Sequence, residues 1–127
     1  MAARRFVEAC CLLLIAGNWG QGIYFATEAA YCDSGRYFFP VQTGQFKGCR
    51  QLFLATVLTG QAALCEPDTT RRMPPIKPKS FASSSVSIED RCDSVACDAT
   101  MPHASGKTTR NYVIFDNGRA YPSYLIT

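Results

Sequence analysis

Two apolar stretches bounded by glycines are the clearest strand signals in the first half of the chain. Residues 20–26 (GQGIYFA) place glycines immediately before an apolar and aromatic run, which predicts a tight turn entering a short strand. Residues 51–59 (QLFLATVLT) are apolar at both alternating sets of positions and end at Gly60. This second run predicts a central strand that is covered on both faces.

The C-terminal residues carry the strongest turn signal. The run 111–115 (NYVIF) and the run 120–126 (AYPSYLI) flank the residues Asp-Asn-Gly-Arg at 116–119. Asn-Gly favours the positive φ angles of a type I′ turn, so the pattern predicts a terminal β-hairpin. Pro122 has no N–H to donate to a ladder, so its strand is expected to be an edge strand or to be bulged at that point.

A short helix and a long loop complete the predicted elements. Residues 27–31 (TEAAY) are good helix formers with Thr27 as a plausible N-cap, and the helical pattern breaks at 33–35. Residues 66–87 contain four prolines and a serine tract, so no regular element is expected there. This stretch is predicted to be a long surface loop.

Composition indicates one folded domain. The chain has 127 residues, of which 47% are hydrophobic and 18% are charged. These values are typical of a single globular domain rather than of a disordered chain. The formal net charge of +3 is scattered, without a basic run or a helical stripe, so nucleic-acid binding is not indicated.

The apolar N-terminus is open to several interpretations. Arg4 and Arg5 precede the run 9–17 (ACCLLLIAG), which resembles the short apolar region of a signal peptide and is too short to span a bilayer. The alternatives are an apolar helix of a cytosolic fold, or residues from a misassigned exon. Cleavage after Gly17 would leave an odd number of cysteines without metal-like pairing, which disfavours a disulfide framework and favours reduced thiols.

Three separated stretches match one protein family in the right order. They are GQGIYFA at 20–26, LFLATVLTG at 52–60 and YVIFDNGRAYPSYLIT at 112–127, and the segment CDSV at 92–95 also matches. One such match could arise by chance, but three in order rarely do. The chain therefore resembles the C-terminal part of the poly(ADP-ribose) polymerase catalytic domain, and its ending is most similar to the mono-ADP-ribosylating branch.

The resemblance implies a fold, a substrate and a domain organisation. The family has an α+β fold with a mainly antiparallel β-sheet that holds NAD in a cleft, here expected to be incomplete with one short helix after the first strand. Residues 1–19 would be a divergent apolar segment, and residues 20–127 a partial catalytic domain. The implied activity is NAD-dependent transfer of ADP-ribose to a protein acceptor, with NAD as substrate and no metal.

The resemblance also implies a nicotinamide pocket. It places the tyrosine of the family's His-Tyr-Glu triad at Tyr24, which would help to wall the pocket with a flat aromatic ring. Tyr37 matches a second tyrosine that stacks on the nicotinamide from the opposite side. Where the family has Ser-Tyr-Ser, this chain has Ala30-Tyr31-Cys32. Cys32 thus replaces a serine that binds the carboxamide, and a thiol is the weaker donor.

The triad glutamate corresponds to Asn111. In the family this glutamate holds the nicotinamide ribose hydroxyl, stabilises the oxocarbenium-like transition state and prepares the acceptor hydroxyl for chain growth. Asparagine can form hydrogen bonds but can neither carry negative charge nor act as a base. The resemblance therefore implies transfer of a single ADP-ribose rather than polymer elongation.

The triad histidine has no counterpart, because residues 1–20 contain no histidine. His103 is the single histidine of the chain and is expected to be a solvated loop residue. Asp93 and Ser94 lack a histidine to complete a catalytic set, so they are assigned to strand structure. The chain is therefore expected to be a fragment or a truncated gene model that does not transfer ADP-ribose alone.

Alternative roles exist for every candidate. Each pocket tyrosine could simply pack in the core, Cys32 could be a small buried hydrophobe, and Asn111 could cap a turn. The leading functional hypothesis is an ADP-ribosyltransferase located in the cytoplasm or nucleus. The alternatives are a catalytically inactive binding or regulatory module that kept the fold, and a small secreted protein.

Overall fold

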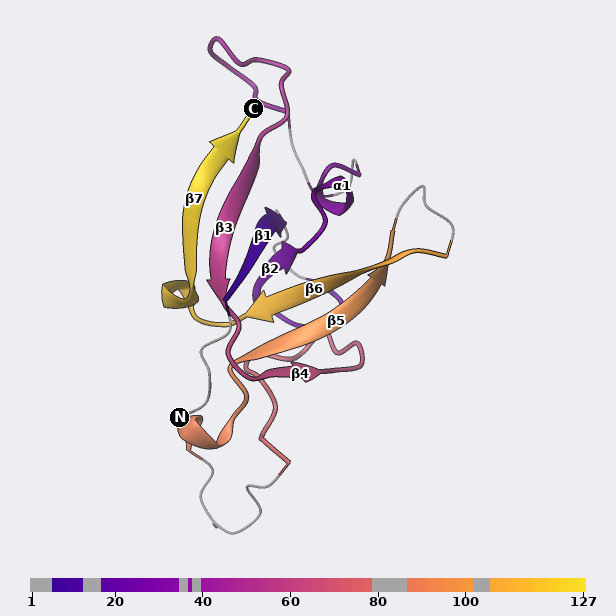
Figure 1. Cartoon of the computed structure of the whole chain (residues 1–127), viewed down its shortest axis with the longest axis vertical. Helices are drawn as coiled ribbons and strands as arrows, with labels where there is room; N and C mark the ends of the chain where they lie inside the picture. The colour runs from indigo at the N-terminus through magenta and orange to yellow at the C-terminus, as the bar shows by residue number, and fades with distance from the viewer. Residues whose placement is uncertain (1–5, 13–16, 35–36, 38–39, 79–86, 102–105) are drawn as a thin grey trace.

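The computed structural model describes residues 6–12, 17–34, 37, 40–78, 87–101 and 106–127. Strands dominate it and helices are short (Figure 1). The elements are β1 (Phe6–Leu12), β2 (Ile23–Ala26), α1 (Ala29–Cys32), β3 (Leu52–Leu58), β4 (Ala62–Leu64), η1 (Ile88–Asp90), β5 (Ser94–Thr100), β6 (Thr108–Ile114), η2 (Asn117–Arg119) and β7 (Ala120–Ile126).

The strands form one seven-stranded sheet in the order β4-β5-β6-β2-β1-β3-β7. Every neighbouring pair is antiparallel except β4 and β5, which are parallel. The predicted sheet-dominated α+β class is therefore confirmed. The short helix follows the GIYFA strand as predicted, and this strand is β2 because β1 precedes it.

The N-terminal segment contributes a strand to the middle of the sheet. Residues Phe6–Leu12 pair with β2 on one side and with β3 on the other. The alternative of an apolar helix over this run is therefore wrong for residues 6–12. The physical reason for the strand is that β2 and β3 each present an open edge to this segment. The backbone N–H and C=O groups buried between these two strands must be paired, and an inserted strand pairs them.

The predicted terminal hairpin is wrong. Strand β6 is hydrogen-bonded on both edges, to β2 and to β5, so β7 crosses to pair with β3 instead. Gly118 is not among the glycines with positive φ, and residues 117–119 form a 3-10 turn rather than a type I′ turn. The Asp116 side chain accepts a hydrogen bond from the Gly118 amide at 2.9 Å, which stabilises this alternative turn.

The structure confirms the expectation for Pro122. Strand β7 lies at one edge of the sheet. Its register with β3 shifts between Leu54, which pairs with Tyr124, and Ala55, which pairs with Pro122. Strand β3 exists as predicted, but it is one strand from the edge rather than central, and Phe53 on it is 44% exposed. The prediction that both of its faces are covered is therefore wrong.

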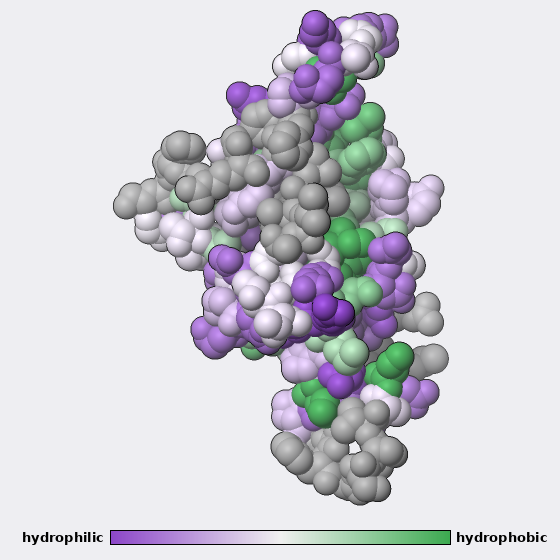
Figure 2. All heavy atoms as spheres, turned by 180° about the vertical axis from the view of Figure 1, so that it is seen from behind, coloured by the Kyte–Doolittle hydropathy of each residue, from purple (hydrophilic) through white to green (hydrophobic). Residues whose placement is uncertain are grey.

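Several large apolar and aromatic side chains are exposed along β3 and β7. Figure 2 shows hydrophobic side chains interspersed with polar ones along the side of the molecule that carries these two strands. The exposed residues there are Phe53, Tyr121, Tyr124, Leu125 and Ile126.

Of the remaining predictions on local structure, the loop is confirmed where it is described and the N-cap is wrong. Residues 66–78 form no helix or strand, as expected for a proline-rich loop, and the serine tract at 79–86 lies outside the described residues. Thr27 is not the N-cap of α1. Glu28 occupies that position without a side-chain cap, and the Thr27 hydroxyl instead donates to the Arg110 carbonyl at 3.0 Å, which ties the loop after β2 to β6.

Two buried clusters cover the two faces of the sheet. One contains Ala9, Phe25, Ala55, Val57 and Ile114. The other contains Tyr24, Ala26, Tyr31, Cys32, Val95, Cys97, Ala99 and Val113, with Trp19 and Tyr37 packed against it. Since side chains alternate along a strand, residues of β2 and β6 that pair directly point to the same face. We call the cluster that contains Tyr24 and Tyr31 the tyrosine cluster.

Candidate functional site

All four residues expected in the nicotinamide pocket lie on the face of the tyrosine cluster. Tyr24 and Cys32 are members, and Tyr37 packs against the cluster. Asn111 pairs with Ala26, a further member, so its side chain emerges on the same face. The fold thus brings together residues that are up to 87 positions apart in the sequence.

Tyr24 is fixed by its own hydroxyl. The side chain is buried, and its Oη donates to the Gly20 carbonyl at 2.7 Å while it accepts from the Trp19 amide at 3.1 Å. Burial raises the pKa of the Tyr24 phenol. A Cβ on Gly17 would collide with the Tyr24 ring, so this turn can accommodate only glycine there. Both backbone partners of the hydroxyl lie in the turn that enters β2.

Tyr37 stacks on Tyr31. The ring centroids lie 5.0 Å apart with an interplanar angle of 25°, and the two hydroxyl oxygens lie 3.1 Å apart. The resemblance implied that Tyr24 and Tyr37 face each other across a slot. In the structure both belong to one group of packed side chains, and the ring partner of Tyr37 is Tyr31. Binding of nicotinamide between Tyr24 and Tyr37 stays a prediction.

Tyr31 was not predicted as a site residue from the sequence. It lies in α1, is 6% exposed, and its hydroxyl interacts with both Tyr37 and the side chain of Asn111. Burial is the main cause of its raised pKa, and the Tyr37 hydroxyl adds to it. The signal that could have identified Tyr31 is its place directly before Cys32 in a segment that resembles the family's Ser-Tyr-Ser.

Asn111 carries an unusual buried polar atom. Its side chain is 2% exposed, and its Oδ1 has no hydrogen-bond partner. An unsatisfied buried acceptor costs about 1 to 3 kcal/mol, so such atoms often mark a functional position. The Asn111 amide partly offsets the raised pKa of Tyr31, because it favours the ionised phenol. Since Oδ1 has no hydrogen-bond partner, any contact of this side chain with the Tyr31 hydroxyl is made by the amide nitrogen.

Two buried cysteines lie beside these residues. Cys32 is fully buried at the end of α1. Cys97 pairs with Asn111 across the sheet, and its thiol donates to the Asn111 carbonyl with a sulfur to oxygen distance of 3.7 Å. Burial raises the pKa of Cys97 to about 12, so this thiol is protonated and unreactive at neutral pH.

Asp93 and Ser94, which were assigned to strand structure rather than to catalysis, form hydrogen bonds with a neighbouring turn. Ser94 donates to the Thr59 carbonyl at 2.8 Å, and Asp93 accepts from the Gln61 amide at 2.8 Å. Both contacts join the start of β5 to the turn after β3. His103 lies outside the described residues.

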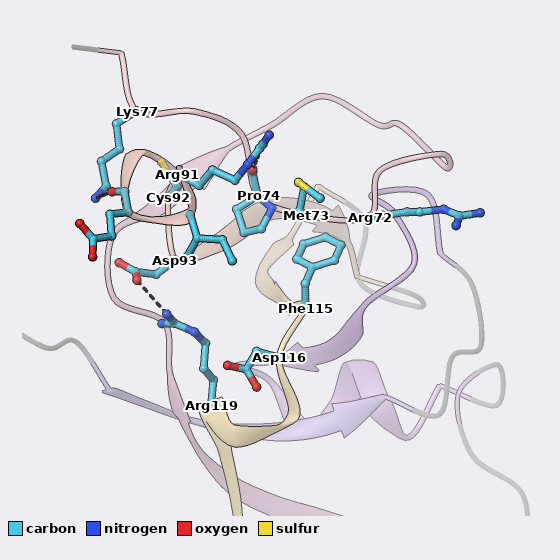
Figure 3. A pocket seen from close by; sticks show the side chains of 12 residues that line it. Arg72, Met73, Pro74, Lys77, Arg91, Cys92, Asp93, Phe115, Asp116 and Arg119 are labelled. Atoms are coloured by element: carbon cyan, nitrogen blue, oxygen red, sulfur yellow. Dashed lines mark hydrogen bonds and ion pairs between the residues drawn. The ribbon is translucent and has the colours of Figure 1, made fainter. Parts of the chain in front are cut away.

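A separate cavity opens near the far end of β6 (Figure 3). Its volume is about 590 Å³, and its lining comes from the loop after β4, from η1 and the residues between η1 and β5, and from the segment between β6 and β7. Met73, Pro74 and Phe115 provide apolar lining, and Arg119 pairs with Asp93 at 3.1 Å. Phe115 also packs against the tyrosine cluster, so the cavity adjoins the cluster at this ring. The other lining residues do not belong to the cluster, and no sequence motif predicted the cavity.

The described residues contain neither a metal-binding cluster nor a membrane-spanning helix. Within these ranges, no group of three or more His, Cys, Asp or Glu side chains could hold a metal ion. No helix in the described part of the chain is long and apolar enough to cross a membrane.

Fold and cluster together define the class of protein. This is a sheet-dominated α+β domain in which the tyrosine of a GIYFA strand and an asparagine of the adjoining strand lie on one face. The family model described as the poly(ADP-ribose) polymerase catalytic domain matches residues 8–127. The chain belongs to this family. The match takes in most of the apolar N-terminal segment, in agreement with the place of β1 inside the sheet.

A curated relative supports the assignment. A probable poly(ADP-ribose) polymerase of Dictyostelium discoideum is 30% identical over 111 residues, which make up 87% of this chain and 24% of that protein. The chain therefore spans about a quarter of the length of this relative.

Proposed function

We propose that this chain provides the nicotinamide-riboside end of the NAD site in an ADP-ribosyltransferase that attaches single ADP-ribose units to protein side chains. The observation that carries the proposal is Asn111, whose buried Oδ1 is unsatisfied at the position of the family's catalytic glutamate. An acceptor oxygen at this point suits a ribose hydroxyl, which is a donor. Family membership supports the transferase class.

The identity of Asn111 favours single transfer over polymer growth. Elongation requires a base that activates the hydroxyl of the previous ADP-ribose unit, and an amide has no basic lone pair on nitrogen. A hydrogen bond from the ribose to Oδ1 would still orient the ribose for loss of nicotinamide. The charge that the glutamate supplies in the family could then come from a carboxylate of the acceptor protein.

A second candidate is an inactive binding or regulatory module. It is favoured by the replacements at Cys32 and Asn111 and by the Tyr24 hydroxyl, which is committed to the turn at 17–20. In this case the domain would bind NAD or a protein without turnover. For either candidate we propose the cytoplasm or nucleus, whose reducing conditions suit the thiols of Cys49, Cys65, Cys92 and Cys97.

Two parallel assays test the proposal. In the first, calorimetry measures binding of carba-NAD, an analogue that cannot release nicotinamide. In the second, the chain is incubated with biotin-tagged NAD and a mixture of acceptor proteins, and the products are separated by size. We expect saturable binding and no transfer by this chain alone, because no residue corresponds to the triad histidine.

Each of the other outcomes has a distinct meaning. Single-unit labelling would support mono-ADP-ribosyl transfer and would contradict both the inactive-module candidate and the expected incompleteness. Ladders of polymer would contradict the role given to Asn111. Failure to bind carba-NAD would refute the NAD site itself.

A further inference from the structure

We propose that Tyr31 is a positioning residue of the NAD site, whose ring fixes the plane of Tyr37 and whose hydroxyl fixes the orientation of the Asn111 amide. The inference rests on the proposed function, because it assigns Tyr31 a role through two residues placed in that site. Three observations carry it: a ring stack, a short contact between hydroxyls, and an open acceptor atom.

The first observation is the stack. Tyr31 is 6% exposed and belongs to the tyrosine cluster, whereas Tyr37 is only half-buried. An offset stack at 5.0 Å and 25° is a favourable geometry for two aromatic rings. The buried ring of Tyr31, held in helix α1, therefore restrains the more exposed ring of Tyr37. A ring that must stack on a planar heterocycle gains affinity when its plane is already fixed.

The second observation is the hydroxyl of Tyr31. A phenol has one donor and can accept two hydrogen bonds, so it can interact with two partners at once. One partner is the Tyr37 hydroxyl at 3.1 Å, and the other is the Asn111 side chain. Because Oδ1 of Asn111 has no hydrogen-bond partner, the proposed contact with Tyr31 is made by the amide N–H.

The third observation is that Oδ1 of Asn111 has no partner although it is buried. An asparagine that could rotate freely would present either its N–H or its oxygen to a ligand. With one N–H held by Tyr31, the amide cannot rotate, and its oxygen stays on the side away from Tyr31. This acceptor oxygen is the feature that asparagine shares with glutamate. Tyr31 would thus preserve the acceptor function of this position after the carboxylate is lost.

Two variants of Tyr31 separate the roles of its ring and its hydroxyl. Tyr31→Phe keeps the stack, so nicotinamide should bind within two-fold of the unmodified chain. The same variant should bind carba-NAD about five-fold more weakly, which is the typical loss for one hydrogen bond in a protein. Tyr31→Ala removes the stack as well, so nicotinamide binding should also fall at least five-fold. Tyr121→Phe, at a residue that is 73% exposed, is the control and should change neither affinity.

A double-mutant cycle shows whether Tyr31 acts through Asn111. In the background of Asn111→Leu, Tyr31→Phe should cause no further loss of carba-NAD affinity, because the amide that it positions is absent. All titrations are made at a temperature where circular dichroism shows each variant to be folded. If Tyr31→Phe weakens binding of nicotinamide and of carba-NAD equally, or still weakens carba-NAD binding in the Asn111→Leu background, the role given to Tyr31 is overturned. The proposed function would not be affected by that result. Absence of binding by the unmodified chain would instead overturn the proposed function, and the role of Tyr31 with it.

Discussion

The Tyr24 hydroxyl is predicted to stabilise the fold in addition to any contact with a ligand. Tyr24→Phe keeps the ring but leaves the Gly20 carbonyl and the Trp19 amide without the partner they have at 2.7 Å and 3.1 Å. Each net hydrogen bond is worth about 1 kcal/mol, so the free energy of unfolding should fall by about 2 kcal/mol. For a domain of this size that loss corresponds to a decrease in Tm of roughly 8 °C.

The assay is thermal and urea unfolding followed by circular dichroism. Tyr124→Phe is the matched control, because it makes the same chemical change at a side chain that is 67% exposed, and its effect should be within about 0.5 kcal/mol. Equal effects of the two substitutions would refute the conclusion that the Tyr24 hydroxyl joins the turn at 17–20 to β2.

Three further predictions concern the fold and its thiols. Gly60→Ala should destabilise the chain by at least about 1 kcal/mol more than Gly44→Ala. Both glycines have positive φ, but of the two only Gly60 has a neighbour, the carboxylate of Asp93, that an added Cβ would meet. Equal urea midpoints of the two variants would contradict this prediction. Iodoacetamide at pH 8 should label the exposed Cys49 and leave the buried Cys97 unmodified until urea is added, as mass spectrometry would show. Because burial raises the pKa of Cys97 from its ordinary value of 9.0 to about 12, the contribution of this thiol to stability is complete below the lower pKa and is lost as pH rises toward the higher one. The decrease in urea midpoint between pH 8 and pH 10.5 should therefore be smaller in Cys97→Ala, and an unchanged decrease would argue against the burial of this thiol.

Local sequence patterns predicted individual strands better than their pairing. The glycine-led run at Ile23–Ala26 and the β-branched run in Thr108–Ile114 are both strands, because alternation and β-propensity act within a few residues. The hairpin that Asn-Gly at 117–118 predicted is nevertheless wrong. The turn signal contains no information on the edges of β6, which are already occupied by β2 and β5.

The same limit applies to the candidate site. Motifs identified Tyr24, Cys32, Tyr37 and Asn111, and the fold places all four on the face of the tyrosine cluster. No motif could show that Tyr37 would stack on Tyr31, since this contact depends on how α1 packs over the sheet. Strand β1 was missed for a similar reason, because a mostly apolar segment of seven residues has no feature that separates a buried strand from a helix.

Nuclear magnetic resonance titration of the labelled chain tests the central claim most directly, because the chain contains two separate places where a ligand could bind. Addition of NAD should shift the signals of Tyr37, Tyr31 and Asn111, and nicotinamide alone should shift those of the two tyrosines. Signals of Arg91 and Arg119, which line the cavity beyond β6 and lie outside the tyrosine cluster, should remain in place. Shifts confined to Arg91 and Arg119, or no shifts at all, would contradict an NAD site in the tyrosine cluster.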